Sequence, residues 1–157
     1  MMSSMKKVFT LVFLRAGKQV LLGMKKRGFG FGKWNGFGGK LEPGESFAEG
    51  AMREVKEECG LDVNPDDLEE TAVIEFEFQG DPVKLEVHVF QTRKFCNDVT
   101  ESEEMRPEWF DETAVPFSNM WVDASCWYHL MFQNKKFKAY FLLQGYDKIL
   151  QENIEIL

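Results

Sequence analysis

Residues 39–61 read GKLEPGESFAEGAMREVKEECGL, and this segment decides the fold. Ser46, followed three residues later by Glu49, is the capping-box pattern typical of the start of a helix. Gly60 indicates where that helix ends, because glycine readily adopts the left-handed conformation that follows a last helical turn. We therefore expect a helix from Ser46 to about Cys59.

The faces of this expected helix differ in character. Apolar side chains recur at every fourth position, which predicts a core-facing stripe of Phe47, Ala51, Val55 and Cys59. Glu54, Glu57 and Glu58 follow i, i+3, i+4 spacing and therefore share another face, within reach of a common point. Acidic helix faces commonly just contact water, but carboxylate oxygens are also the ligands that Mg²⁺ or Mn²⁺ prefers. Spacing alone leaves both interpretations open.

A glycine-rich stretch precedes the helix and favours the metal site. Residues 27–40, RGFGFGKWNGFGGK, hold six glycines. They predict a long loop or bulged strand whose backbone can approach a ligand closely. Gly50, inside the expected helix, costs about 1 kcal/mol relative to alanine. We therefore expect a neighbouring group to pack against it.

Outward from this segment, apolar and alternating runs predict the remaining elements. A second helix, rich in aromatic residues, is expected at residues 119–134. Strands are expected at residues 7–14, 19–24, 71–78, 84–93, 108–111 and 137–143. Strands interspersed with two helices predict an α/β or α+β sandwich. The length of 157 residues suits one domain covering residues 1–157.

Composition excludes several function classes. The formal net charge of −7 argues against binding a nucleic-acid polymer, which usually requires a basic surface. Three dispersed cysteines form neither a disulfide framework nor a zinc motif, and they suit a reducing compartment. The N-terminal MMSSMKKVFTLVFLRAGK weakly resembles a signal peptide, but its short apolar run without a cleavage site favours a core strand. We expect a cytoplasmic monomer that does not contact membranes, with nuclear and mitochondrial pools left open.

The segment at residues 39–61 resembles the Nudix box, whose pattern is G-x5-E-x7-R-E-U-x-E-E-x-G-U, where U is bulky and aliphatic. Every defined position is filled, by Gly39, Glu45, Arg53, Glu54, Val55, Glu57, Glu58, Gly60 and Leu61. The resemblance implies the Nudix fold, an α/β/α sandwich with a mixed β-sheet. It also implies a hydrolase that uses Mg²⁺, for which Mn²⁺ can substitute.

The resemblance further implies a role for each residue of the box. The metal ligands would be the carbonyl of Gly39 and the carboxylates of Glu54, Glu57 and Glu58. Arg53 would orient these catalytic carboxylates through charge-assisted hydrogen bonds, and Glu45 would pair with Arg53. The metal would neutralise the phosphate chain and lower the pKa of bound water. One of Glu57 and Glu58 would also act as general base, and the sequence leaves that choice open.

The likeness extends, through segments such as ESEEMRPEWF and NMWVDASCWY, to family members that hydrolyse oxidised purine nucleoside triphosphates. It implies conversion of 8-oxo-dGTP, and of other modified purines such as 2-oxo-dATP, to monophosphate and pyrophosphate, which keeps mutagenic nucleotides out of DNA. Asn35 would read the purine edge, Trp121 would stack on the base, and Glu104 would be an outer metal ligand. The other implied substrate contacts are Thr10, Lys25, Phe29, Gly38, Phe76, Phe78, Leu85 and Asp123. Phe76 and Phe78 share one face of a strand, so an alternative stays open in which both belong to the core. Trp127 is expected to be a core residue rather than a ligand contact.

One position departs from that pattern, since the resembled proteins have two adjacent aspartates where this chain has Asp123-Ala124. A carboxyl pair can share a proton and so serve both as donor and as acceptor. Asp123 alone can accept when ionised or donate when protonated, but cannot do both. We expect 8-oxo-dGTP cleavage with altered pH dependence or altered tolerance for oxidised adenines. The alternatives are hydrolysis of another nucleoside diphosphate derivative and a non-catalytic binding module, against which the intact box carboxylates argue.

Overall fold

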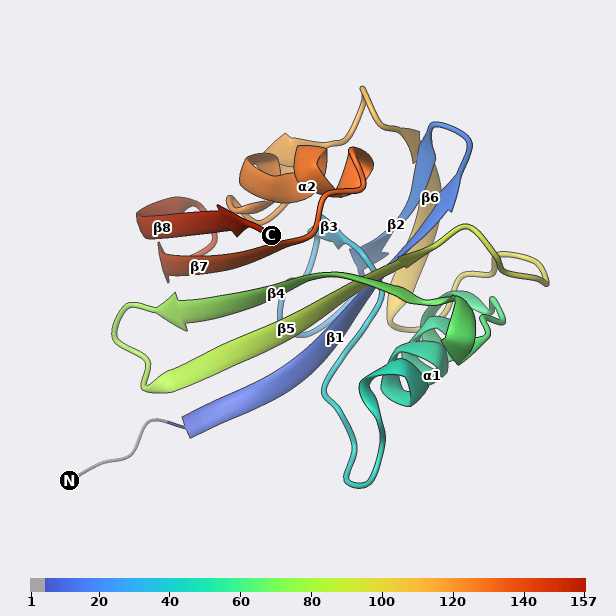
Figure 1. Ribbon diagram of the computed structural model, residues 1–157, viewed down its shortest axis with the longest axis horizontal. Helices are drawn as coiled ribbons and strands as arrows, with labels where there is room; N and C mark the ends of the chain where they lie inside the picture. Colours follow the sequence, from blue (N-terminus) through green and yellow to red (C-terminus); the bar gives the residue numbers. More distant parts are fainter. Residues whose placement is uncertain (1–4) are drawn as a thin grey trace.

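The computed structural model describes residues 5–157, which form a mixed β-sheet between two helices (Figure 1). The strands are β1 (Met5–Ala16), β2 (Gln19–Lys25), β3 (Trp34–Asn35), β4 (Glu69–Phe78), β5 (Val83–Thr92), β6 (Met105–Asp111), β7 (Phe137–Gln144) and β8 (Lys148–Ile156). The helices are α1 (Phe47–Cys59) and α2 (Ala124–Phe132), with 3-10 turns η1 (Pro65–Asp67) and η2 (Phe117–Asn119).

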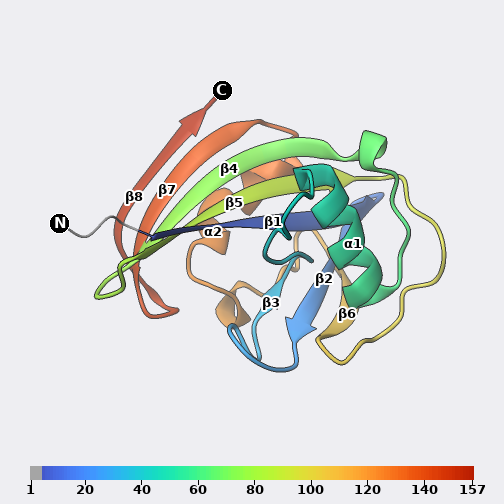
Figure 2. The ribbon, with the colours of Figure 1, turned by 90° about the horizontal axis from the view of Figure 1, so that it is seen from below.

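The sheet has the strand order β3-β2-β1-β5-β4-β7-β8, and β6 pairs with β2 along its whole length. The β1–β5 and β4–β7 pairs are parallel, whereas the remaining pairs are antiparallel. Figure 2 shows the curvature of the sheet, in which β8, β7 and β4 arch away from β3 and β2. This curvature leaves room on the α2 side of the sheet.

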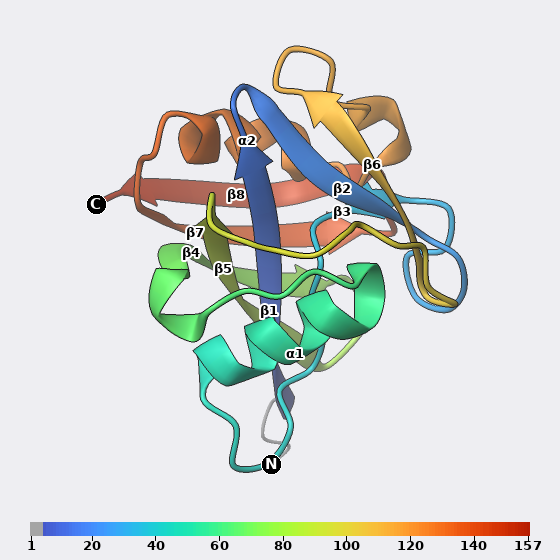
Figure 3. The ribbon, with the colours of Figure 1, turned by 90° about the vertical axis from the view of Figure 1, so that its right-hand side faces the viewer.

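Strand β1 is central and is covered on both faces. Val12 and Leu14 are buried in the apolar cluster that contains the inner side of α1. Phe13, between them, is buried in the cluster that contains α2. Successive side chains of a strand point to opposite faces, which is why a continuous apolar run indicates a strand between two layers. Figure 3 shows α1 and α2 on opposite sides of the strands, so the predicted α/β/α sandwich with a mixed sheet is confirmed.

Helix α1 begins and ends as predicted. The Ser46 hydroxyl accepts a hydrogen bond from the Glu49 amide, and the Glu49 carboxylate accepts one from the Ser46 amide, each at 3.1 Å. Gly60 ends the helix in the left-handed conformation, with φ of 80°. A Cβ on Gly50 would lie 2.7 Å from the Leu41 side chain, so the expected close neighbour is confirmed.

The predicted apolar stripe of α1 is wrong at its first position. Ala51, Val55 and Cys59 are buried, but Phe47 is 37% exposed. Its ring instead stacks on His88 of β5, with the ring centres 3.9 Å apart. As the first residue of the helix, Phe47 lies beyond the part of α1 that faces the core.

The secondary structure differs from the expectation in two further places. The second helix covers Ala124–Phe132 rather than residues 119–134, because Met120 has extended backbone angles (φ −132°, ψ 167°). The glycine-rich stretch, expected to be a long loop or bulged strand, contains the short strand β3. Strand β8 was not predicted, since KILQENIEI is an edge strand with mostly exposed side chains and no regular apolar alternation.

The leader-like N-terminal run lies largely in β1, where it forms part of the core, and residues 1–4 fall outside the described part of the chain. Within residues 5–157, no helix has the length and apolar character needed to cross a membrane.

Candidate active site

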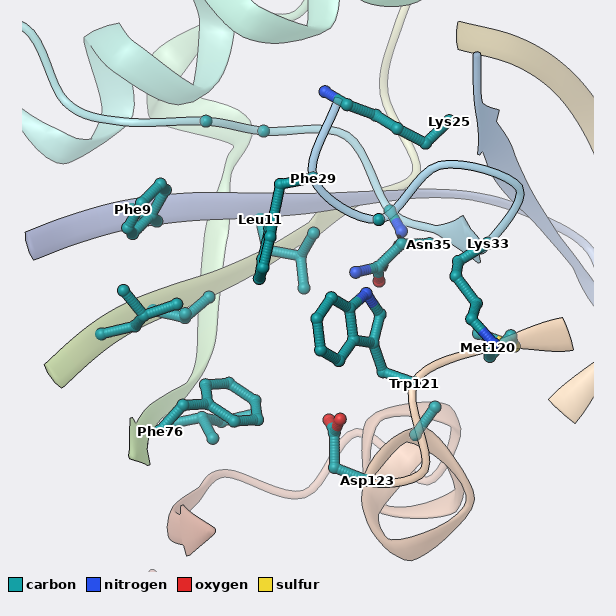
Figure 4. Close-up of a pocket in the computed structure, with 18 of the residues that line it drawn as sticks. Phe9, Leu11, Lys25, Phe29, Lys33, Asn35, Phe76, Met120, Trp121 and Asp123 are labelled. Atoms are coloured by element: carbon teal, nitrogen blue, oxygen red, sulfur yellow. Dashed lines mark hydrogen bonds between the residues drawn. The ribbon is translucent and has the colours of Figure 1, made fainter. Parts of the chain in front are cut away.

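A cavity of about 400 Å³ opens between the curved sheet and the start of α2 (Figure 4). This volume is in the range of small-molecule sites. All the predicted substrate contacts line it, namely Thr10, Lys25, Phe29, Asn35, Gly38, Phe76, Phe78, Leu85, Trp121 and Asp123. Phe76 and Phe78, for which a core position stayed open, are only partly buried and face this space. The structure therefore brings together residues from segments far apart in the sequence, and their roles stay predictions.

Asn35 has a defined hydrogen-bond arrangement in this cavity. Its Oδ1 accepts one bond from the Gly36 amide at 2.8 Å and another from the Tyr128 hydroxyl at 3.1 Å. Figure 4 shows the Asn35 amide and the Asp123 carboxyl on the same cavity, next to the Trp121 ring. Polar groups thus project into an otherwise largely apolar space, as is typical of sites that orient a small ligand.

Asp123 is a buried carboxyl at the start of α2. Its Oδ2 accepts a hydrogen bond from the Trp127 indole at 2.8 Å. Burial raises its pKa from 3.8 to about 6, which outweighs the opposite effect of that hydrogen bond. Trp127 is itself buried, as expected, but it also lines the cavity and holds this carboxyl. The Thr10 hydroxyl, also on the cavity wall, is buried without a hydrogen-bond partner among the described residues.

Aromatic rings form one side of the cavity mouth. The Trp121 ring centre lies 5.0 Å from that of Phe29 and 5.8 Å from that of Phe78. The Tyr146 ring, in the turn between β7 and β8, lies 4.5 Å from Trp121 on its outer side. Such flat, polarisable surfaces suit a stacked base.

The box residues form a separate, charged region beside the cavity. Arg53 contacts Glu45 through two hydrogen bonds, at 2.6 Å and 3.0 Å, and Glu54 at 2.9 Å. These carboxylates, Glu45 foremost, raise the pKa of the Arg53 guanidinium further. This two-bond geometry ties the middle of α1 to the loop before the helix.

Glu54 and Glu58 are the inward-facing carboxylates of the box. Glu58 is only 4% exposed, and its Oε1 accepts a hydrogen bond from the Gly38 amide at 2.8 Å. Burial and the nearby charge of Glu54 raise the pKa of Glu58 to about 8. Burial likewise raises the pKa of Glu54. Two carboxylates with little water around them are strongly stabilised by a nearby cation.

The third glutamate of the predicted set lies elsewhere. The Glu57 side chain is 59% exposed and lies 3.4 Å from Arg53. In the described part of the chain, no three or more acidic, histidine or cysteine side chains are already grouped as a metal cage. In this conformation Glu57 therefore lies apart from the inward pair, and its role as a metal ligand stays a prediction.

The other predicted metal ligands lie close to the inward pair. A Cβ on Gly39 would lie 2.6 Å from the Glu54 carboxylate, so a side chain at this position would force that carboxylate to move. The Gly39 carbonyl accepts a bond from the Thr10 amide at 3.0 Å, which leaves it one lone pair. Glu104 lies 3.2 Å from Lys25, and the charges of both act on Glu58. These oxygen-only donors fit a divalent ion of the Mg²⁺ type.

Several cavity residues were missed by the sequence analysis. Phe9, Leu11 and Lys33 line the cavity beside residues that were predicted. Tyr128 is the most informative omission, because it contacts Asn35 across 93 positions of sequence. Tyr128 follows Trp127, which lies one helical turn after Asp123. In the sequence, this i, i+4 spacing is what indicates that the start of α2 and Asp123 face the same space.

Comparison with known proteins agrees with this geometry. A model of the NUDIX domain matches residues 5–131. The zebrafish (Danio rerio) oxidized purine nucleoside triphosphate hydrolase is 48% identical over 149 residues, covering 95% of this chain and 94% of the relative. The mouse (Mus musculus) protein of the same name is 47% identical over 151 residues, covering 96% of each chain.

Two further matches are more distant. The human (Homo sapiens) 8-oxo-dGDP phosphatase is 32% identical over 114 residues, covering 69% of this chain but only 33% of that protein. The crystal structure of the MutT protein from Bacillus halodurans superposes with a TM-score of 0.81 at 23% identity, covering 95% of this chain and 97% of that one. At that identity, the superposition establishes the fold alone.

Proposed function

Because this chain belongs to the NUDIX family, we propose that it hydrolyses oxidised purine nucleoside triphosphates, with 8-oxo-dGTP as the main substrate. The observation that carries the proposal is the cavity in which Asn35, Trp121 and Asp123 meet, directly beside an intact box. The similarity to two hydrolases of that name over nearly the whole chain supports the same substrate class. The products are the nucleoside monophosphate and pyrophosphate.

The cavity binds the base and orients it. Trp121 stacks on the purine, while Phe29 and Phe78 exclude water from its other edges. The Asn35 amide and the Asp123 carboxyl contact the polar edge of the base. At neutral pH Asp123 is ionised and accepts hydrogen bonds, since its pKa of about 6 lies below that pH. A guanine-type edge, which carries adjacent N–H donors, matches that state.

The box holds the reacting phosphates. NUDIX hydrolases generally use divalent metal ions such as Mg²⁺. Here Glu54 and Glu58, together with the Gly39 carbonyl, would hold Mg²⁺, and Glu57 and Glu104 would complete the set. The ion would supply neutralisation of phosphate charge and acidification of water. Lys25 lies between the cavity and Glu104, where it can contact the phosphate chain.

The direct test is pyrophosphate release with Mg²⁺ from 8-oxo-dGTP, with dGTP and ADP-ribose measured in parallel. We expect release from 8-oxo-dGTP at a kcat/KM well above that for dGTP. Preferred cleavage of ADP-ribose would indicate another NUDIX substrate. An 8-oxo-dGDP arm, measured as phosphate release, tests the diphosphate alternative that the human relative suggests. No turnover in any arm would indicate a binding module.

The site of attack can be read from hydrolysis in ¹⁸O-labelled water. Attack at the β-phosphorus places the label in pyrophosphate, which is the expected result. Label only in the nucleotide product would mean attack at the α-phosphorus. The substrate is a free nucleotide rather than a polymer, and we place the reaction in the cytosol, with the chain acting as a monomer. Size-exclusion chromatography at working concentration checks the monomer.

A further inference from the structure

We propose that Tyr128 is a positioning residue that holds the Asn35 amide in the orientation set by the Gly36 amide, so that Asn35 presents only hydrogen-bond donors to the bound base. This inference rests on the proposed function and adds a determinant of specificity to it. Tyr128 acts through Asn35, with which its hydroxyl forms a hydrogen bond.

The polarity of Asn35 follows from a neighbour that can only donate. The oxygen and nitrogen of a carboxamide have nearly the same shape, so hydrogen-bond partners decide which is which. The Gly36 backbone amide lies 2.8 Å from one of these atoms of Asn35. Since an amide N–H cannot accept, the atom facing it must be Oδ1.

Tyr128 donates the second hydrogen bond that Oδ1 of Asn35 can accept. Its hydroxyl lies 3.1 Å from Oδ1 of Asn35, where it donates. Burial keeps Tyr128 protonated, because it raises the pKa of the hydroxyl well above its ordinary value. A carbonyl oxygen has two lone pairs, and both are now used. The Asn35 nitrogen has no hydrogen-bond partner among residues 5–157, so its two N–H groups remain for a ligand in the cavity.

Tyr128 itself is held firmly. Its side chain is fully buried, and its ring centre lies 5.2 Å from that of Phe13 and 5.7 Å from that of Phe117. Packing from both sides fixes the position of the hydroxyl at low entropic cost to the hydrogen bond. Helix α2 and the residue that precedes it therefore carry two unlike controls on the base. Asp123 can change between acceptor and donor with pH, whereas Tyr128, together with the Gly36 amide, holds Asn35 as a donor.

The first test is Tyr128→Phe, which removes the hydroxyl and keeps the ring. We expect KM for 8-oxo-dGTP to rise about fivefold with kcat nearly unchanged, as for loss of one neutral hydrogen bond that acts on base binding. Tyr140→Phe, which removes a hydroxyl from β7 outside the cavity, is the matched control and should leave both constants unchanged. An unchanged KM in folded Tyr128→Phe would overturn the inference.

A double-mutant cycle with Asn35→Ala separates positioning from a general packing effect. If Tyr128 acts through Asn35, adding Tyr128→Phe to Asn35→Ala should change KM by less than twofold. The same fivefold effect in both backgrounds would mean that the hydroxyl acts independently of Asn35, which contradicts the proposal. Thermal unfolding of each variant shows whether it is folded at the assay temperature.

Asn35→Asp gives an independent arm, which also serves if Tyr128→Phe fails to fold. This change keeps an oxygen for Gly36 and Tyr128 but replaces both N–H donors with a second oxygen. We expect at least a tenfold higher KM for 8-oxo-dGTP, and an unchanged KM would overturn the assignment of donors. If the wild-type chain cleaves no oxidised purine nucleotide, the proposed function fails; if it does and these variants behave as wild type, only the role of Tyr128 fails.

Discussion

The box and the base cavity lie side by side but are built in opposite ways. The box is one continuous segment, residues 39–61, in which Arg53 bonds to Glu45 and Glu54 within eight positions of sequence. The cavity collects side chains from β1, β3, β4, β5 and α2, and these contacts are mostly aromatic. The chemistry of cleavage can thus be carried by a local pattern, whereas the choice of substrate depends on tertiary packing.

The sharpest way to break this comparison is to disable the box alone. Glu58→Gln keeps an acceptor for the Gly38 amide but removes the charge needed by a metal. We expect kcat for 8-oxo-dGTP to fall about a hundredfold or more, measured by pyrophosphate release under saturating Mg²⁺. A kcat within threefold of wild type would show that Glu58 has no part in the metal site.

The next largest effect is expected for Asp123→Asn in the cavity. The folded pKa of Asp123 is about 6 and its ordinary value is 3.8, so the folded state binds this proton more tightly. The stability of the wild-type chain should therefore fall as pH rises from about 4 to 6, and stay at the lower level above pH 6. Asn can still accept from Trp127 and lacks the buried charge. We expect it to be more stable at pH 7.5 by about 2 kcal/mol, measured by urea unfolding.

The same variant tests the role of Asp123 in binding. In the wild type, KM for 8-oxo-dGTP should rise as pH falls below about 6, because the acceptor becomes protonated. In Asp123→Asn this pH dependence of KM should disappear. The pH dependence of kcat, which the box carboxylates determine, should be the same as in the wild type. A wild-type pH profile retained by the variant would assign the titration to another group.

Trp121→Ala tests the aromatic side of the cavity. Loss of a stacked ring should raise KM for 8-oxo-dGTP about tenfold, with a smaller change in kcat, since stacking acts on the base rather than at phosphorus. Tyr146 packs on the outer side of Trp121 and gives a useful comparison. If Tyr146→Ala raised KM more than Trp121→Ala, Tyr146 rather than Trp121 would be the ring that stacks on the base.

The smallest effect is expected for Ala124→Asp. Ala124 is buried and lines the cavity directly after Asp123, so the change places two carboxyls side by side. Their repulsion should move the midpoint of the pH–rate profile upward by about one unit and increase the relative activity toward 2-oxo-dATP. Identical profiles and substrate ratios for the two proteins would show that a second carboxyl has no influence here.

The same contrast explains what could be predicted from sequence. Helix α1 was predicted at both ends, because Ser46, Glu49 and Gly60 act on the backbone within one turn. The central strand β1 was also predicted, because burial on both faces leaves a continuous apolar run. Strand β8 was missed, since it is stabilised by pairing with β7 rather than by its own pattern.

For the site, the residues were recognisable but their geometry was not. The spacing of Glu54, Glu57 and Glu58 predicts a shared helix face, yet it does not show that the Glu57 side chain is exposed while that of Glu58 is buried. The bond between Tyr128 and Asn35 joins α2 to β3, and no local pattern links them. Burial, which sets the pKa of Asp123, likewise exists only in the folded chain.

The most direct test of the division between box and cavity is the ratio of kcat/KM for 8-oxo-dGTP to that for dGTP, measured in wild type, Glu58→Gln and Trp121→Ala. Glu58→Gln should lower both values in the same proportion and leave the ratio unchanged within about twofold, because the two nucleotides share one phosphate chain. Trp121→Ala should change the ratio. A ratio shifted as strongly by Glu58→Gln as by Trp121→Ala would contradict the separation of cleavage from substrate choice.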